Sequence, residues 1–409
     1  MQSTAVEIDK SSQPATVRIE KLVYGGEGLG RIDGQVVLTP FVLPGEEVSI
    51  ATEQVKSGLL RGSALKIVQP ASQRIVPRCE YFVTCGGCHY QHAEYTFQLE
   101  QKGNILRETL RRGGGISYEG EIPVISGNPW FYRNRIQLHF ADDRSGFHQA
   151  GSRELCAIDH CYIASPLLVD AIAKLRGAVK QREWPSFLRS VDLFTNGTEV
   201  QLTIADSSRP VAARFFEWCG TFLPNLASGP IRYAAAGYEF RIGRGSFFQV
   251  NRFLIDALVR EVIGEAKGRT AIDLYAGVGL FSLALSQRFQ VVEAVERSGP
   301  AFRDLGSNAA QNAANVRCAR ASAEEFLQAL GEAPDLIVAD PPRAGLDREV
   351  TAELLRLRPD RLIVASCDPA TMARDLKKLL TAYRIERLAL VDLFPQTYHF
   401  ETVVHLRRN

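Results

Sequence analysis

A cluster of cysteines is the first feature of the sequence with the chemistry of a metal site. Cys79, Cys85 and Cys88 follow a C-x5-C-x2-C spacing, and Cys161 comes 73 residues after Cys88. Thiolates held this close together repel one another unless a metal neutralises them, and a fourth thiolate from further along the chain would complete the site. Because four cysteines bind either zinc or an iron–sulfur cluster, the spacing predicts a metal centre without naming the metal.

Two choices within this centre stay open. His89 and His92 lie beside the cluster and offer a mixed cysteine–histidine zinc site, and Cys156 competes with Cys161 for the fourth position. The other cysteines, at 219 and 318, have no such neighbours and are expected in the core.

Cys367 stands apart from that cluster, at the end of an apolar run. The run RLIVAS (361–366) has the composition of a strand buried on both faces of a parallel sheet, and a proline follows two residues after the thiol. Asp340 ends the run DLIVAD (335–340) before two prolines in the same way. Since ligands of open α/β sheets bind beyond the carboxyl ends of their strands, we expect both side chains in one functional crevice.

A cofactor site is expected in the same crevice. The segment DLYAGVG (273–279) follows another apolar strand, and its glycines let the backbone turn sharply at Tyr275 and Gly277 and pass close to a ligand. Glu296 ends the next strand, where a carboxylate can accept hydrogen bonds from both ribose hydroxyls of an adenosine. The third glycine of a dinucleotide fingerprint is absent, which favours S-adenosylmethionine over a dinucleotide.

These residues need a scaffold, and the sequence divides into parts that differ in periodicity. We expect a disordered tail over 1–11 and a small five-stranded β-barrel of the OB or a related kind over 12–70, where short apolar runs alternate with glycine-rich turns. Residues 71–240 are expected to form an α+β domain, in which an amphipathic helix over 93–112 may pack on the catalytic domain. From 241 to 409 apolar strands alternate with helices, the doubly wound, Rossmann-like α/β pattern.

The composition excludes some classes of protein and leaves others open. The chain has 409 residues and a net charge of only +2, so bulk charge gives no argument for nucleic acid and any such case depends on the sites. The first residues are polar and lack the core of a signal peptide, and no apolar run reaches the roughly 18–20 residues that span a bilayer. We therefore expect a cytoplasmic monomer without a membrane partner.

Taken together, the motifs resemble those of the RNA uridine C5-methyltransferase family, whose members methylate C5 of uridine in ribosomal or transfer RNA. The resemblance covers nearly the whole chain. Two residues depart from the family pattern and leave the implied reaction unchanged. Asp368 follows the cysteine where the family usually has Asn, and Leu280 stands where Asn is common. The matching segments, in family order, are SFFQVN (246–251), DLYAGVG (273–279), DPPRAGL (340–346), SCDPAT (366–371) and DLFPQTYHFE (392–401).

The resemblance implies a role for individual residues of these segments. Cys367 is expected to be the nucleophile and Glu401 the general base. The target base is expected to be held by Phe247, Gln249 and Asp340. The expected cofactor contacts are Gln249, Tyr275, Gly277, Glu296 and Asp340.

The resemblance also bears on the N-terminal parts. It implies that the barrel is a TRAM-like RNA-binding domain and that the cysteines Cys79, Cys85, Cys88 and Cys161 hold a 4Fe–4S cluster, with zinc as the alternative. Cys161 is preferred to Cys156 because the segment DHCY (159–162) matches the family's position.

The proposed reaction explains why these residue types are needed. Uracil C5 is too weak a nucleophile to attack a methyl sulfonium, but a thiolate that adds to C6 places electron density on C5. The thiol pKa is therefore expected to lie below its ordinary value of about 8.5, and a base must later remove the C5 proton. The base of a folded RNA must be flipped out, stacked and read on its edge. Phe247 and Gln249 are expected to do this from one face of a short strand.

Arg133 and Arg135 are the candidate RNA contacts of the central part. They stand two apart on an expected strand, with Trp130 and Tyr132 interleaved, a pattern that suits contacts to backbone and bases. A solvated arginine face is the alternative.

Three questions of function stay open in the sequence. By the family resemblance, the barrel and the cysteines imply 23S ribosomal RNA as the target, with transfer RNA as the alternative. An RNA cytosine C5-methyltransferase would use the same covalent chemistry but often needs a second cysteine. A non-catalytic RNA-binding iron–sulfur protein is a third candidate, against which the intact Cys367, Glu401, Asp340 and Glu296 argue.

Overall fold

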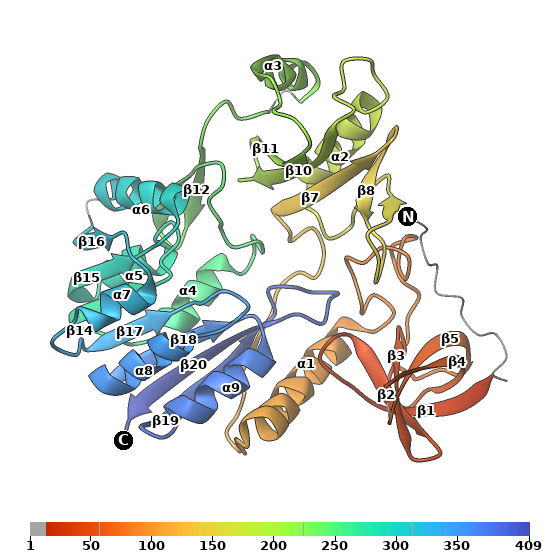
Figure 1. Cartoon of the computed structure of the whole chain (residues 1–409), viewed down its shortest axis with the longest axis horizontal. Helices are drawn as coiled ribbons and strands as arrows, with labels where there is room; N and C mark the ends of the chain where they lie inside the picture. Colours follow the sequence, from red (N-terminus) through yellow and green to blue (C-terminus); the bar gives the residue numbers. More distant parts are fainter. Residues whose placement is uncertain (1–13, 57, 224, 313) are drawn as a thin grey trace.

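A computed structural model describes residues 14–409 except for positions 57, 224 and 313, together with the side chains of all of these but 54–56. The disordered tail expected over 1–11 lies outside the described residues. Figure 1 shows three parts: the N-terminal barrel, a central sheet and a large C-terminal sheet with its helices. Across the described residues no helix is both long and apolar enough to cross a membrane.

The N-terminal barrel closes on itself, which confirms the prediction of five short strands in a small barrel. The strands pair in the order β1-β2-β3-β5-β4 around a core that includes Val17, Ile19 and Val48. Closure removes the unpaired strand edges that an open sheet of this size would expose. The strands are β1 (Ala15–Leu22), β2 (Glu27–Ile32), β3 (Gln35–Pro40), β4 (Glu47–Lys56) and β5 (Leu59–Gln69).

The central part is an antiparallel sheet covered by helices. The strand order is β11-β10-β7-β8-β9, and the apolar faces of the sheet and of its helices share one core. Its elements are β7 (Arg135–Ala141), β8 (Arg144–His148), β9 (Leu155–Ala157), α2 (Pro166–Ala178), β10 (Leu188–Thr195), β11 (Val200–Ser207) and α3 (Ala213–Phe222).

The C-terminal sheet has eight strands in the order β16-β15-β14-β17-β18-β20-β19-β6. The first five strands in this order, from β16 through β15, β14 and β17 to β18, run parallel to one another. Strand β20 is antiparallel to both of its neighbours. Successive residues of β17 belong alternately to the two large cores on either side of the sheet, so both faces are buried, as continuous apolar strands predict. The strands are β14 (Gly268–Leu274), β15 (Phe289–Val295), β16 (Val316–Ala319), β17 (Leu336–Ala339), β18 (Arg361–Ser366), β19 (Tyr383–Val391) and β20 (Glu401–Arg408).

The helices of this part alternate with the strands, as predicted, and cover both faces of the sheet (Figure 1). The helices are α4 (Ile255–Ile263), α5 (Leu280–Ser286), α6 (Gly299–Gln311), α7 (Ala323–Gln328), α8 (Arg348–Leu357) and α9 (Pro369–Leu379).

Three segments of the range assigned to the central domain pack in the C-terminal part, among them the helix already considered for packing on the catalytic domain. Helix α1 (Tyr95–Thr109) and the single π-helical turn after it (Leu110–Gly114) share the core of α9, and β6 (Val124–Ile125) pairs with β19 at the edge of the large sheet. The hairpin of β12 (Ile231–Ala235) and β13 (Tyr238–Ile242) packs with α4. The division at residue 240 therefore does not describe how these segments pack.

The loop of residues 392–400, between β19 and β20, is the place where the parts of the molecule meet. The Nζ atom of Lys102 lies 2.6 Å from Oδ1 of Asp392, and neither side chain has any exposed surface. Tyr95 donates a hydrogen bond to the same carboxylate, and the Lys102 ammonium also donates to the Phe394 carbonyl. Burial lowers the pKa of Lys102 and Asp392 opposes that shift, so the charge of the lysine depends on its partner.

We expect Lys102→Ala to destabilise the protein by about 3–5 kcal/mol, because it leaves the Asp392 carboxylate buried without its counter-charge. The midpoint of thermal unfolding measures this loss. Replacing both partners, as Lys102→Met with Asp392→Leu, should cost less than the single change. Lys174→Ala is the matched control, since its pair with Asp170 is partly exposed and should contribute less than about 1 kcal/mol. Equal losses for the two lysines would contradict this account of the loop.

Candidate active site

The strand order brings the predicted residues to one edge of the C-terminal sheet. Tyr275, Glu296, Asp340 and Cys367 each follow the last residue of a parallel strand, namely β14, β15, β17 and β18, which are neighbours in the sheet. Glu401 opens the antiparallel β20, so it lies at the same edge. Since Ser366 pairs with Thr402, the next residues outward along the two strands are Cys367 and Glu401.

The candidate nucleophile is held in a short turn between β18 and α9. Asp368 caps α9, and its carboxylate accepts hydrogen bonds from the N–H groups of Ala370 and Thr371, each at 2.9 Å. Asp and Asn are equally good at this position, so the departure from the usual Asn leaves the cap intact. The hydroxyl of Ser366 accepts a hydrogen bond from the Asp368 N–H at 3.2 Å and holds the turn from its other side.

The electrostatic surroundings of this thiol differ from the prediction. Burial, with a smaller contribution from the charge of Glu401, raises the pKa of Cys367 to about 11, whereas the Arg343 guanidinium opposes the shift. The expectation of a lowered pKa is therefore wrong for the protein without its substrates. Sequence spacing does not show this, because it reports neither burial nor the two carboxylates at the neighbouring strand ends.

Glu401 and Asp340 form a buried acidic pair beside the thiol. Glu401 is only 6% exposed, and its Oε1 atom has no hydrogen-bond partner among the described residues. Burial raises the pKa of Glu401 well above its ordinary value, and the nearby Asp340 raises it further. Burial also raises the pKa of Asp340 to about 6. The pair therefore retains a proton near neutral pH. Burial lowers the pKa of His399, two residues before Glu401, to about 3, so this imidazole stays neutral.

The expected cofactor loop has the backbone geometry that its glycines allow. Tyr275, Gly277 and Gly279 all have positive φ, at 61°, 58° and 95°. A tyrosine in this region is strained, and such strain is typical of functional loops. The Glu296 carboxylate accepts hydrogen bonds from the N–H groups of Gly277 at 2.8 Å and Ser298 at 2.6 Å. The loop and the carboxylate are thus joined at the edge where an adenosine would bind.

Asp273 is a site residue for which the sequence analysis gave no role. It is fully buried at the end of β14, and Ser282 of α5 donates to one of its oxygens at 2.5 Å. The other oxygen has no partner among the described residues. Burial raises its pKa to about 7. Its place in the DLYAGVG segment was the available signal, but the sequence does not show that the carboxyl group faces the loop.

The residues expected to hold the target base do not lie on one strand. Residues 243–251 are irregular, and β13 ends at Ile242. The Phe247 side chain is 61% exposed, whereas Gln249 is 9% exposed, so their surroundings differ. The prediction of a single strand is wrong because side chains bind the backbone of this segment: Arg135 donates to the Ser246 carbonyl and Asn134 donates to the Gln249 carbonyl.

Arg133 and Arg135 have different surroundings. The Arg135 guanidinium binds both carboxylate oxygens of Asp192 at 3.0 Å and the Ser246 carbonyl at 2.8 Å, so it is engaged within the protein. Arg133 lines a large cavity next to the cysteines. A third arginine, Arg78, is exposed and lies over aromatic rings at 4.5–5.4 Å from their centroids. Those rings belong to Trp130, Phe131 and Tyr162.

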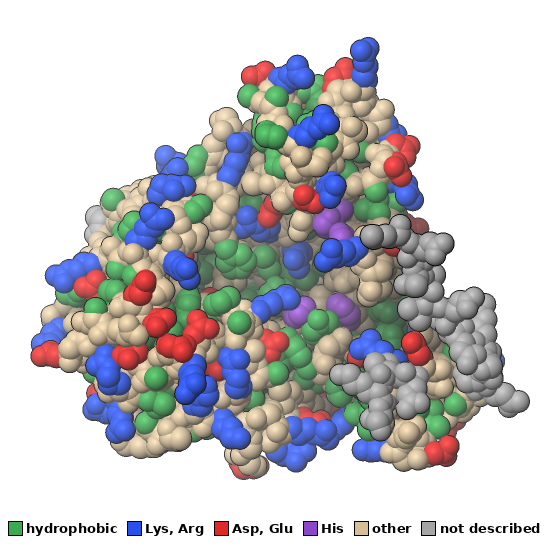
Figure 2. Space-filling model, viewed as in Figure 1, with side chains coloured by type: hydrophobic (Ala, Val, Ile, Leu, Met, Phe, Trp, Pro, Cys, Tyr) green, Lys and Arg blue, Asp and Glu red, His purple; other side chains and the backbone are tan. Residues whose placement is uncertain are grey.

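The cavity has a volume of about 970 Å³ and lies between the barrel, the cysteine segment, the central sheet and the 392–400 loop. Figure 2 shows this face of the molecule hollowed, with histidine side chains gathered around the hollow. Arg343 and His399 connect the cavity to the surroundings of Cys367. The four predicted cysteine ligands line it together with five histidines: Cys79, Cys85, Cys88, Cys161, His89, His139, His148, His160 and His399.

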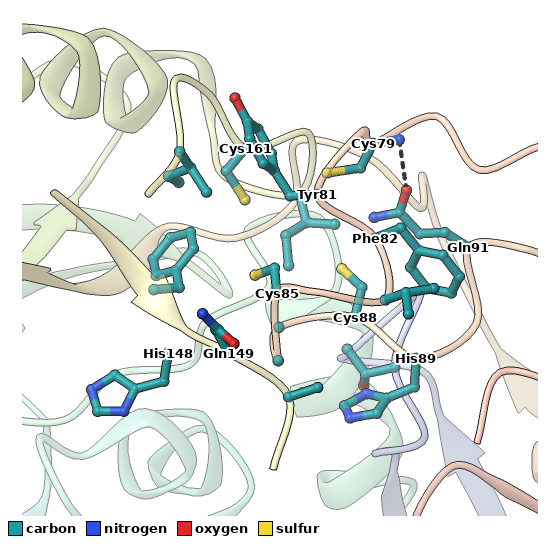
Figure 3. A pocket seen from close by; sticks show the side chains of 18 of the residues that line it. Cys79, Tyr81, Phe82, Cys85, Cys88, His89, Gln91, His148, Gln149 and Cys161 are labelled. Carbon is teal, nitrogen blue, oxygen red and sulfur yellow. Dashed lines mark hydrogen bonds between the residues drawn. The ribbon is translucent and has the colours of Figure 1, made fainter. Parts of the chain in front are cut away.

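The four cysteines lie around one space, as Figure 3 shows. Burial, with smaller contributions from the neighbouring cysteines, Cys161 among them, raises the pKa of Cys85 to about 12, so the thiols are close enough to repel as thiolates. Cys156 instead packs into the core of the central sheet and is 6% exposed. Among the described residues no three His, Cys, Asp or Glu side chains are close enough to hold one metal ion.

Comparison with known proteins agrees with this architecture. Residues 231–409 match the family described as tRNA (uracil-5-)-methyltransferase, and residues 13–65 match the TRAM domain. An uncharacterized RNA methyltransferase of Aquifex aeolicus is 32% identical to this chain over 96% of its length and 98% of the relative. A similar protein of Thermotoga maritima is 31% identical over 95% of this chain and 98% of the relative.

A solved structure resembles nearly the whole chain. The Pyrococcus abyssi tRNA (uracil-54, C5)-methyltransferase, in complex with S-adenosyl-L-homocysteine, superimposes with a TM-score of 0.74 and 26% identity. It covers 96% of this chain, and the match takes in all of the solved chain. The methyltransferase fold and the TRAM barrel predicted from the sequence are thereby confirmed.

We expect Glu296→Ala to weaken S-adenosylmethionine binding by about tenfold or more, since it removes the carboxylate placed for the ribose hydroxyls. Titration calorimetry with the cofactor measures this loss, and affinity for RNA should not change. Glu293→Ala, on the same strand but paired with Arg317, is the matched control and should bind the cofactor normally. Arg133→Ala should do the reverse of Glu296→Ala, with weaker RNA binding and an unchanged cofactor affinity.

Proposed function

The chain belongs to the S-adenosylmethionine-dependent RNA uracil-5-methyltransferase family, and on that premise we propose that it methylates C5 of a uridine through a covalent adduct with Cys367. The observation that carries the proposal is the position of Cys367 and Glu401 at the sheet edge. Each lies one residue outward from the last paired residues of β18 and β20, Ser366 and Thr402. A nucleophile and a base on adjacent strand ends can act on neighbouring carbons of one ring. Family membership also sets the cytosine and binding-only alternatives aside.

Each residue has a separate task in the proposed reaction. The Cys367 thiol loses its proton to solvent, and the thiolate then forms a bond to C6 of uracil. The electron density that moves to C5 forms the new bond to the methyl group while the bond between that methyl group and the sulfonium sulfur breaks, and S-adenosylhomocysteine leaves. Glu401, in its ionised form, then removes the C5 proton, and the bond between C6 and sulfur breaks to release the thiolate and restore the aromatic base.

The free protein is not ready for this chemistry, since its thiol is protonated and its carboxylates share a proton. S-adenosylmethionine supplies the electrophilic methyl group and a positive charge next to these carboxylates when it is bound. A positive charge lowers the pKa of neighbouring carboxyl groups and thiols. Arg343 acts in the same direction at Cys367. We infer that Gln249, Tyr275, Gly277, Glu296 and Asp340 hold the cofactor.

The RNA is proposed to enter through the large cavity. Phe247 is exposed enough to stack on a flipped base, and we infer that Gln249 and Asp340 contact the polar edge of that base. Arg133 and the Arg78 cluster offer cationic and aromatic contacts to neighbouring nucleotides. Arg135 would then act by holding the Ser246 carbonyl, and hence the loop that carries Phe247.

The proposed target is ribosomal RNA, because the barrel and the cysteine centre occur together in this chain. Transfer RNA is the alternative, since the similar Pyrococcus abyssi enzyme acts on uracil 54 of tRNA. Mapping 5-methyluridine in both RNA classes from a deletion strain decides between them.

We propose that Cys79, Cys85, Cys88 and Cys161 hold a 4Fe–4S cluster. The proposal is supported by four thiols that line one cavity, the number of ligands that a 4Fe–4S cluster or zinc takes, and by the family resemblance, which favours the cluster. Such a centre would cross-link the cysteine segment to the end of the central sheet. Its ligands would be charged only in its presence, because burial raises the pKa of the free thiols.

We expect Glu401→Gln to trap the covalent intermediate. The variant should bind RNA, attack it and transfer the methyl group, and then stall because elimination of the cysteine waits for loss of the C5 proton. A slow-migrating protein–RNA adduct that carries label from the cofactor methyl should persist in denaturing gels. Cys367→Ala and the double variant should give no adduct. Normal turnover of Glu401→Gln would mean that another group is the base, and methylation by Cys367→Ala would refute the covalent mechanism.

We expect anaerobically purified protein to be brown and to contain about four iron atoms per chain. Metal analysis and the visible absorption spectrum measure this. Cys161→Ser should lose the iron, whereas Cys156→Ser should keep it because that thiol lies in the core. A colourless protein with stoichiometric zinc would overturn the cluster, and iron loss from Cys156→Ser alone would show that the fourth ligand is misassigned.

A further inference from the structure

A tyrosine of the N-terminal barrel reaches the candidate nucleophile. Tyr24 lies on the turn between β1 and β2, and its hydroxyl donates a hydrogen bond to the backbone carbonyl of Cys367 at 3.1 Å. The same oxygen lies 3.4 Å from Nδ1 of His399. Tyr24 and Cys367 are 343 positions apart in the chain. A domain that is otherwise remote from the sheet edge therefore touches the residue proposed to attack the base.

The turn that carries Tyr24 is closely packed against the 392–400 loop. The Tyr24 ring makes edge-on contacts with Tyr398 and Phe400, at 5.3 and 6.0 Å between ring centroids. Gly26 has a φ of 87°, and a Cβ atom there would lie 3.0 Å from Tyr398 and 3.2 Å from His89. Any larger residue at this position would push the turn away. The approach of Tyr24 to Cys367 is thus built into the packing.

The hydroxyl is suited to donate to a carbonyl. Burial and the charge of Asp368 raise the pKa of Tyr24 far above its ordinary value, so the group keeps its proton at any physiological pH. A carbonyl oxygen can only accept, so the direction of the hydrogen bond is set by chemistry. The carbonyl of Cys367 is one bond from the Cα atom that carries the thiol.

We propose that Tyr24 is a positioning residue for Cys367, which makes the barrel part of the active site as well as an RNA-binding module. The turn of Cys367 is held by Ser366 on the sheet side, by the Asp368 cap on the helix side, and by Tyr24 at the carbonyl. Attack on C6 requires the sulfur to be aligned with the base, and a small displacement of a reacting group is costly in rate. The proposal rests on the proposed function of Cys367.

The test is Tyr24→Phe, which keeps the ring contacts and removes only the hydroxyl. At saturating cofactor and RNA, the single-turnover rate of methylation should fall roughly tenfold, with unchanged affinity for both ligands and an unchanged melting temperature. With RNA that contains 5-fluorouridine, the covalent adduct of the variant should form more slowly by the same factor, but the final yield of adduct should equal that of the wild type. Rate loss without affinity loss distinguishes positioning from a purely structural or RNA-docking role.

Tyr383→Phe is the matched control. It removes the buried hydroxyl of the first residue of β19, which has no hydrogen-bond partner in the described part of the chain, and should leave all these values unchanged. A trapping rate for Tyr24→Phe equal to wild type would overturn the proposal, as would a loss confined to RNA affinity. If the wild-type protein itself forms no adduct, the failure lies with the covalent mechanism and not with Tyr24.

Discussion

The buried pair of Lys102 and Asp392 is the interaction on which the active-site edge depends. The 392–400 loop has no regular structure, yet most of it is buried, so its polar backbone groups need partners. The partners come from other parts of the chain: Gln98 pairs with Gln396, Tyr132 and Asn251 donate to loop carbonyls, and the Gln396 carbonyl accepts from two N–H groups beside the cysteines. Because the loop ends in Glu401, the position of the proposed base depends on contacts made by every part of the molecule.

A second constraint is the accumulation of acid at the sheet edge. Parallel strands bring their carboxyl ends together, and here those ends carry Asp273, Glu296 and Asp340, with Glu401 added by the antiparallel strand. Burial and neighbouring carboxylates raise the pKa of Asp273, of Glu401 and of Cys367. The arrangement is unfavourable in the free protein and suits a cationic ligand. The thiol would thus become reactive only when a positive charge is present, which protects it from side reactions in the meantime.

Much of this architecture could be predicted from the sequence, for identifiable reasons. Strands buried on both faces are apolar throughout, so the four that end at Tyr275, Glu296, Asp340 and Cys367 are recognisable, and parallel topology then brings their ends together. Properties that arise from packing were not predictable. The raised pKa of Cys367 comes from burial and from carboxylates distant in sequence. Phe247 and Gln249 do not lie on a strand, because the side chains of Arg135 and Asn134 bind the backbone carbonyls of their segment. The two residues of β6 are too few to show a period.

The convergence on one loop has a consequence for how the parts can work together. The barrel approaches the 392–400 loop through Tyr24 and Gly26, and the cysteine segment approaches it through His89 and Tyr90, whose N–H groups bind the Gln396 carbonyl. Gly26 and His89 also lie against each other. A displacement of the barrel or of the cysteine segment must therefore disturb the loop, since a packed interior transmits strain. The parts that line the cavity proposed for RNA and the residues proposed to do chemistry thus share one packed junction. RNA that binds in the wrong position in this cavity would therefore displace the reacting residues.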